Sequence, residues 1–222
     1  MRRRGFEREG AEFGRGLGFF DAIHGFAITL LVVNIEPPPA EAWSSPATLF
    51  AHGLGTNLMG FAISFVVIAM FWRYNTEILS RFSAIDQAVI TSNLFSAALI
   101  VLLPFTTQGI SEFSDYPLAV ALYACNVALV ILSQSITLEV GRRRGLLLKD
   151  PSPALIRAER LDTAVKIGIF LLSIAVAYLI DPNLGMASWL LLLVFGPLMG
   201  RRTARAMAAQ AEDEGEIHEQ NS

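Results

Sequence analysis

Three residues able to carry a proton or to coordinate an ion interrupt an apolar segment near the N-terminus: Asp21, His24 and Thr29. A polar or ionisable side chain costs free energy in an apolar environment, so each is a candidate functional residue. Histidine titrates near neutral pH and is able to shuttle protons, although a hydrogen bond between helices is the simpler role for His24. Asp21 fits either an ion pair with Arg15 or the capping of a helix start.

The same segment carries four residues at positions i, i+3, i+4 and i+7, which places them on one face of a helix. Two interpretations of this stripe remain open. In the first it is a packing seam, and the hydroxyl of Thr29 bonds to the carbonyl of Gly25. In the second, symmetric copies bring the stripes together around an axis and form an apolar constriction with a ring of hydroxyls. The stripe consists of Phe26, Thr29, Leu30 and Val33. Small residues continue nearly the same side toward the N-terminus at Gly18, Ala22 and Gly25.

The composition of the chain indicates a membrane protein. Of its 222 residues 53% are hydrophobic and only 17% are charged, and the mean hydropathy is +0.49, which is unusual for a soluble domain. The net charge of −3 offers no basic field for nucleic acid, so we expect no nucleic-acid partner. The single cysteine, Cys125, excludes an intrachain disulfide and a cysteine-based metal centre.

Six apolar segments approach the roughly 20 residues that a helix needs to cross a bilayer. They predict an all-α polytopic membrane protein with six transmembrane helices in each subunit. A proline run after Glu36 ends the first segment, and Asp181-Pro182-Asn183 predicts a tight turn before the last. The segments lie at about Leu17–Ile35, Gly53–Trp72, Ala88–Phe105, Pro117–Leu138, Ala164–Ile180 and Leu184–Gly200.

The distribution of Lys and Arg predicts the orientation of these helices. Basic residues stand before the first segment, after the second, after the fourth and after the sixth, and the three opposite loops contain acidic residues but no Lys or Arg. Since basic loops stay in the cytoplasm, we expect both termini there. Termini on one side of the membrane require an even number of spans, which agrees with the six segments. We divide the chain into a basic cytoplasmic tail at 1–16, a transmembrane domain at 17–202 and an acidic cytoplasmic tail at 203–222.

Three sequence elements resemble the transmembrane protein 175 family. Arg15-Gly16-Leu17-Gly18-Phe19-Phe20-Asp21, with Ala27-Ile28-Thr29-Leu30-Leu31-Val32 after it, resembles the family's Arg-x-x-x-Phe-Ser-Asp signature and the Ala-Ile-Thr-Leu-Leu-Val that follows. Phe71-Trp72-Arg73-Tyr74-Asn75 is similar to its Trp-x-x-His/Asn element, and Leu102-Leu103-Pro104-Phe105-Thr106 to its Leu-Pro-Phe ending. The likeness covers about the first half of the chain and extends to the rest through the topology alone.

The resemblance implies a potassium channel. Bacterial members of the family are six-span subunits that assemble as homotetramers with the first helix lining the pore, whereas animal members carry two such repeats. By position, the narrowest ring of the pore falls on Phe26, further apolar pore positions fall on Leu30 and Val33, and the pore threonine falls on Thr29. The signature arginine and aspartate, which family members use to tie the inner ends of the helices together, fall on Arg15 and Asp21. Phe19, Trp72 and Asn75 complete this structural network.

Three positions depart from the family pattern. Phe20 replaces the signature serine, Phe26 replaces a branched aliphatic residue, and His24 stands where an apolar residue is usual. Four phenyl rings at one level would seal a pore more firmly than aliphatic side chains or would rotate to open it.

Together these observations predict a passive, potassium-permeable cation channel with a hydrophobic gate. We expect it in the bacterial plasma membrane, in contact with lipid, and with potassium and other monovalent cations as its permeant partners. We expect no cofactor and no metal site beyond potassium passing near Thr29, and no enzymatic activity, because no nucleophile or metal arrangement is recognisable. The alternatives are a proton-coupled carrier that uses His24 and Asp21 and a non-conducting membrane scaffold.

Overall fold

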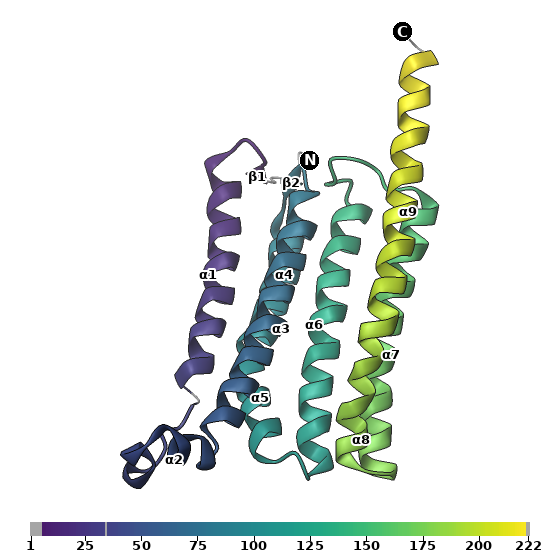
Figure 1. Cartoon of the computed structure of the whole chain (residues 1–222). Coiled ribbons are helices and arrows are strands. Elements are labelled where there is room, and N and C mark those ends of the chain that lie inside the picture. Colours follow the sequence, from purple (N-terminus) through teal and green to yellow (C-terminus); the bar gives the residue numbers. More distant parts are fainter. Residues whose placement is uncertain (1–5, 34, 221–222) are drawn as a thin grey trace.

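The computed structural model of the chain describes residues 6–33 and 35–220 and shows a bundle of long helices lying side by side (Figure 1). Six of its helical segments are long and apolar enough to cross a membrane, so the predicted all-α fold with six membrane-length helices is confirmed. The first two are α1 (Ala11–Val33) and α3 (Leu54–Ser80). The third is α4 (Gln87–Val101) continued by α5 (Leu103–Glu112), and the fourth is α6 (Pro117–Arg143). The fifth is α7 (Pro153–Leu179), and the sixth consists of α8 (Pro182–Ala187), the short turn η2 (Ser188–Leu190) and α9 (Leu191–Gln220).

Short elements close the two ends of the bundle. The connection from α1 to α3 holds the 3-10 turn η1 (Ala40–Ser44) and the short helix α2 (Pro46–Ala51). At the opposite end, strands β1 (Phe6–Glu7) and β2 (Ala84–Ile85) form an antiparallel pair. The all-α prediction did not include this pair, because two-residue strands show no alternation in the sequence.

Several helices extend past the hydrophobic segments of the sequence. The helix α1 begins at Ala11, inside the predicted N-terminal tail, and the third span continues beyond Phe105 as α5. The helix α9 runs to Gln220 and so takes in most of the predicted acidic tail. Hydropathy marks the part of a helix that lies in hydrocarbon, whereas backbone hydrogen bonds continue on either side of it. The division at residues 16 and 202 stays a prediction, and its outer parts, 1–5 and 221–222, lie outside the described residues.

Both ends of the described chain lie at the same end of the bundle (Figure 1). The N-terminal segment is fixed there by Arg8, whose backbone N–H donates to the carbonyl of Ser83 at 3.0 Å. Its guanidinium donates to the carbonyls of Ser80 at 2.6 Å and Phe82 at 3.1 Å. This arrangement matches the even number of spans inferred from the loops, while the side of the membrane on which it lies stays a prediction. We refer to this end as the basic end.

Capping residues and prolines set the helix starts. Asp181 accepts hydrogen bonds from the backbone N–H groups of Asn183 at 2.8 Å and Leu184 at 3.1 Å, which confirms the turn predicted before the sixth span. Pro104 stands in the first turn of α5, where its missing N–H separates α5 from α4 without ending the span. Gly185 is needed on α8, because a Cβ there would lie 2.8 Å from the carbonyl oxygen of Ser173 on α7.

The core has one cluster in the middle of the bundle and others toward the basic end. The middle cluster joins α1, α3, α4, α5, α6 and α7 and includes Ala27, Leu31, Ile68, Ile100, Tyr123, Val127 and Phe170. Toward the basic end, one cluster gathers around the fully buried Phe82 and another around Phe20. All three clusters bury one face of α1 and thereby fix which of its residues point away from the bundle.

Candidate pore-lining helix

The helix α1 has a buried face and an opposite exposed face. At about 100° per residue, the four stripe residues are centred on the side opposite the buried residues. In the described chain 69% of Phe26, 43% of Leu30 and 74% of Val33 are exposed, and Thr29 is exposed as well. The buried face consists of Phe13, Phe20, His24, Ala27 and Leu31.

The hydroxyl of Thr29 is bonded within its own helix. Its Oγ1 donates to the carbonyl oxygen of Phe26 at 2.8 Å. The acceptor is therefore one turn back at i−3, and the packing-seam interpretation was wrong in assigning it to Gly25. Since the hydroxyl hydrogen is used in this bond, the lone pairs of Oγ1 are directed away from it and are available to a cation or to water.

Small residues beside the stripe leave the surface of α1 open. A Cβ placed on Gly14, Gly18 or Gly25 would have no atom of another described segment within 4 Å. Small residues at such intervals let a second helix approach closely in a membrane. The exposed face of α1 thus has room for the close approach of another helix.

One hydrogen bond joins the signature residues of α1 and α3. The indole Nε1–H of Trp72 donates to the Oδ1 of Asp21 at 2.8 Å. Asn75 lies one turn further along α3 and is 2% exposed. Phe19 points outward with 53% of its surface exposed, and its ring makes an edge contact with Phe20. The structure therefore brings Asp21 and Trp72 together and leaves Phe19 on the open face.

Arg15 and Asp21 do not pair. The helix α1 is continuous from Ala11, so these two residues are about 9 Å apart along its axis and point in different directions. The described residues contain no ion pair between them, and the side chain of Arg15 is exposed. The ion pair suggested from the sequence required an extended or partly helical entry, which the structure does not have.

His24 is buried between α1 and its neighbours, with 2% of its surface exposed. Its Nδ1 lies 2.8 Å from the carbonyl oxygen of Phe20 in the same helix, and a carbonyl only accepts, so Nδ1 carries the hydrogen. The Nε2 has no hydrogen-bond partner among the described residues. The expected hydrogen bond between helices is therefore absent from the described structure, and one nitrogen of a buried imidazole is left unsatisfied.

Sequence reasoning missed the ionic contacts at the basic end. Asp86 caps α4 by accepting from the N–H groups of Ala88 at 3.0 Å and Val89 at 3.2 Å, and its other oxygen pairs with Arg144. Burial alone would raise the pKa of Asp86, but the Val89 N–H and the Arg144 guanidinium outweigh burial and hold this pKa below its ordinary value. The partners lie 58 positions apart in the sequence, so no local pattern signals the pair.

The part of the chain that the structure describes has no group of three His, Cys, Asp or Glu residues placed to hold a metal ion. Near the C-terminal end of α1, a cavity of about 320 Å³ lies between α1, α3 and α5. Its lining includes Glu36 and Glu112 as well as the polar residues Asn57 and Gln108. The carboxylate of Glu112 accepts from the amide of Gln108 at 2.8 Å. This cavity gives the C-terminal end of α1 an acidic and polar surrounding.

These features define a multi-pass membrane protein whose first helix presents an unpartnered face. Residues 15–104 match the sequence model of a family described as "Endosomal/lysosomal potassium channel TMEM175". A protein from Streptomyces collinus that is named a potassium channel is 28% identical over 195 residues, which make up 83% of this chain and 92% of that protein. The rat protein named "Endosomal/lysosomal proton channel TMEM175" is 27% identical over 120 residues, 52% of this chain and 23% of the rat protein.

A solved structure has the same fold. It is the crystal structure of a lysosomal potassium-selective channel TMEM175 homolog from Chamaesiphon minutus, with a TM-score of 0.67 and 22% identity over 87% of this chain and 98% of that chain. The resemblance to the transmembrane protein 175 family is thereby confirmed. The family is one of ion channels, which also confirms the prediction that the chain is not an enzyme.

Proposed function

We propose that the chain is the subunit of a homotetrameric, potassium-permeable cation channel with α1 around the central axis. The names of the Streptomyces relative and of the Chamaesiphon structure support potassium as the permeant ion. The observation that carries the proposal is the exposed face of α1, where Phe26, Thr29, Leu30 and Val33 lie together opposite the buried face. Four copies of such a face around an axis would line a pore.

The gate of this pore would be hydrophobic. An ion entering a ring of Phe26 side chains loses water ligands and gains none in return, so a narrow ring empties of water and blocks conduction. Opening then requires the first helices to splay or rotate. Leu30 and Val33 would extend the apolar section toward the outer end of the pore.

Selectivity would rest on Thr29. Its hydroxyl already donates to the Phe26 carbonyl, so its oxygen is oriented as an acceptor, and four such oxygens would replace part of the hydration shell of potassium. A potassium ion gives up water more easily than the smaller sodium ion. We therefore infer a modest preference for potassium, with the ion passing close to Thr29 and without a permanently bound metal or cofactor.

The outer end of α1 would concentrate cations. Glu36 and Glu112 line the cavity beside it. Their field attracts cations within a Debye length of about 8 Å, beyond which salt screens it. In the proposed orientation this cavity faces away from the cytoplasm. Both termini lie in the cytoplasm, and the channel sits in the plasma membrane of a bacterium.

One observation favours a second candidate, a carrier or channel in which protons move. His24 leaves Nε2 buried without a partner, and a buried ionisable residue in a membrane helix is a candidate for proton transfer. The rat relative bears the name of a proton channel. In this alternative His24 would gain and lose a proton as transport proceeds, with Asp21 one turn away on the same helix.

The proposal is tested by ion flux through purified protein in liposomes, with potassium, sodium and a proton-leak control run in parallel. We expect passive potassium flux in the wild type and an increase of about tenfold in Phe26→Ala, which corresponds to about 1.4 kcal/mol less barrier. Val32→Ala is the matched control, because Val32 is 57% exposed on the same helix but lies off the stripe. It should leave the flux unchanged.

Two further measurements separate the alternatives. Thr29→Ala should lower the ratio of potassium to sodium flux, and an unchanged ratio would remove Thr29 from the selectivity argument. His24→Leu should abolish proton flux while sparing potassium flux if protons move through the histidine. Absence of potassium flux from both wild type and Phe26→Ala, in correctly assembled tetramers, would refute the channel and favour a scaffold.

A further inference from the structure

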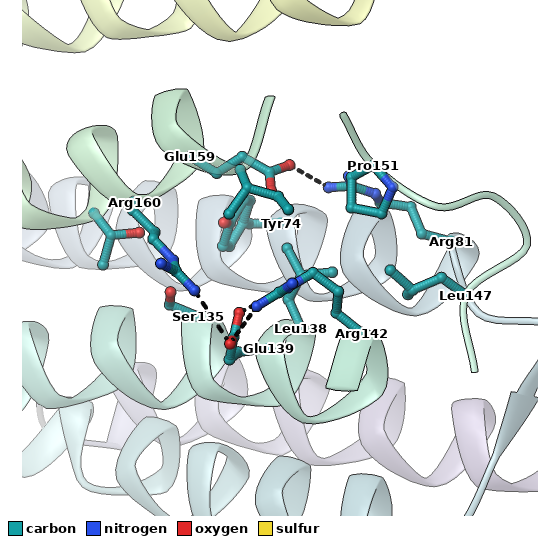
Figure 2. A pocket seen from close by; sticks show the side chains of 12 residues that line it. Tyr74, Arg81, Ser135, Leu138, Glu139, Arg142, Leu147, Pro151, Glu159 and Arg160 are labelled. Carbon is teal, nitrogen blue, oxygen red and sulfur yellow. Dashed lines mark hydrogen bonds and ion pairs between the residues drawn. The ribbon is translucent and has the colours of Figure 1, made fainter. Parts of the chain in front are cut away.

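A cluster of arginines surrounds a single carboxylate at the basic end of α6 and α7. The Oε1 of Glu139 accepts from the Nε of Arg143 at 2.7 Å and from the Nη2 of Arg160 at 3.2 Å. The Oε2 of the same carboxylate accepts from the Nε of Arg142 at 2.9 Å. Figure 2 shows Arg142 and Arg160 converging on Glu139 from α6 and α7. One negative charge thus holds three guanidinium groups close together.

The cluster carries an excess of positive charge. The three arginines that contact Glu139 carry two more positive charges than this carboxylate neutralises. The neighbouring pair of Arg81 and Glu159, also visible in Figure 2, is neutral in itself. Arg157 stands on α7 three residues before Arg160, on the same side of the helix, and is exposed. Because guanidinium groups that share one carboxylate repel one another, an additional anion would stabilise the cluster.

Two of the three arginines are open to a ligand. The side chain of Arg143 is 71% exposed and that of Arg160 is 61% exposed. Toward the described residues Arg143 donates only through Nε and Arg160 only through Nη2, so both retain N–H groups that can hold a phosphate oxygen. The cavity that Glu139, Arg142 and Arg160 line measures about 30 Å³, which suits a water molecule better than a phosphate. An anion would therefore bind at the rim of the cavity.

An apolar surface on α6 lies next to these arginines. Leu122, Leu129 and Ile136 are 50%, 43% and 46% exposed and precede Arg143 at intervals of seven residues. This spacing keeps all four on nearly one side of α6, because seven residues complete almost two turns. Beside them an open groove of about 740 Å³ runs between α4 and α6, lined by Phe95, Ile136 and Val140, with Arg144 at its basic end. A hydrocarbon chain fits this surface, whereas a free anion gains nothing from it.

We propose that this surface binds an anionic phospholipid. Its phosphate lies on the exposed guanidinium groups of Arg143 and Arg160, and one acyl chain lies along α6 in the groove against Ile136 and Phe95. The side of the membrane follows from the predicted orientation, which places the basic end at the cytoplasmic leaflet, where anionic lipids attract basic residues. The site is remote from the exposed face of α1, and it does not depend on the proposed channel function.

The test is native mass spectrometry of the full-length protein in detergent, titrated with phosphatidylglycerol or with phosphatidylcholine. We expect phosphatidylglycerol to bind more tightly. Arg143→Gln and Arg160→Gln should each weaken its binding about fivefold, in line with the attraction of one basic residue to an anionic surface. The matched control is Arg201→Gln, which removes an exposed arginine of α9 outside the cluster and should bind as the wild type does. Equal binding of the two lipids, or unchanged binding when Arg143→Gln and Arg160→Gln are combined in one protein, would overturn the proposal.

A second variant keeps the ion pairs of Glu139 intact. Ile136→Ser removes apolar contact from the groove and should weaken phosphatidylglycerol binding several-fold while the arginines stay in place. Titration with inorganic phosphate then separates a lipid from a free anion. Phosphate at millimolar concentration should not displace the lipid, because it lacks the acyl chain. Displacement by phosphate, together with normal lipid binding in Ile136→Ser, would show that the cluster recognises any anion and would refute a lipid site.

Discussion

Gly141 on α6 faces the ring of Phe82. Because the two are so close, we expect Gly141→Ala to destabilise the protein although it adds only one methyl group. A Cβ at position 141 would lie 2.1 Å from Cε1 and 2.4 Å from Cζ of Phe82. Two carbon atoms in contact are normally about 3.5 to 4.0 Å apart, so Gly141→Ala forces the ring to move by more than 1 Å. Phe82 is fully buried in the cluster that joins α1, α3, α4 and α6 at the basic end, so a shift of its ring displaces packed neighbours.

The expected loss is about 2 kcal/mol. Overpacking of a well-packed core costs about 3 kcal/mol at the upper end of its usual range, and replacing a helical glycine by alanine returns about 1 kcal/mol. For a chain of this size each kcal/mol shifts the melting temperature by roughly 2 to 4 °C. Gly141→Ala should therefore lower the melting temperature by about 4 to 8 °C, measured by fluorescence-detected unfolding of the detergent-solubilised protein.

A control and a second-site variant make the reasoning refutable. Gly168 also lies within a helix, and a Cβ there would meet nothing within 4 Å, so Gly168→Ala should not lower the melting temperature. Phe82→Leu shortens the obstructing ring and should rescue part of the loss when combined with Gly141→Ala, with a coupling of about 1 kcal/mol. Equal melting temperatures for the two alanine variants, or strict additivity with Phe82→Leu, would show that the contact is not as described.

Two further predictions concern hydrogen bonds to carboxylates. Asp86→Asn keeps a good cap for α4 but loses the ion pair with Arg144, so it should lower stability at pH 7 by about 1 to 2 kcal/mol. Since the folded pKa of Asp86 is depressed, its contribution to stability is present above about pH 4 and is lost as the pH falls below that value. The melting temperature of the variant should therefore depend less on acid pH than that of the wild type. Parallel curves of melting temperature against pH would contradict this. Trp72→Phe removes the indole donor to Asp21 and should reduce the melting temperature and the yield of assembled protein, by up to about 2 kcal/mol of stability, without altering the potassium to sodium flux ratio. An altered ratio at unchanged stability would place Asp21 in the permeation path instead.

The sequence predicted what depends on local pattern. The six spans follow from hydropathy, and the shared face of Phe26 and Val33 follows from helical spacing, because both properties repeat within one helix. The turn at Asp181 follows from residue chemistry that acts over three positions. The resemblance placed Asp21 and Trp72 in one group of signature residues, and the structure adds the hydrogen bond between them across 51 positions.

Prediction from the sequence failed where a partner residue is distant in the chain. It also failed where a helix is longer than its apolar segment. The side of α1 that His24 faces was not known until the buried residues of α1 were seen together, so its bond to Phe20 was mistaken for one between helices. The pair of Asp86 and Arg144 and the arginines around Glu139 depend on the packing of α4, α6 and α7. Charged residues at helix ends were assigned to loops and tails, because hydropathy does not register a helix that continues into water.

The strand pair at the basic end has a practical consequence for handling the protein. Residues 6–8 are attached to β2 and to the carbonyls that end α3, so a purification tag placed at the N-terminus is joined to a segment that anchors the first helix. Deletion of residues 1–8 would release that anchor. The helix α9 instead projects beyond the bundle at its C-terminal end (Figure 1), and a tag or fluorophore there is separated from the packed core by several helical turns.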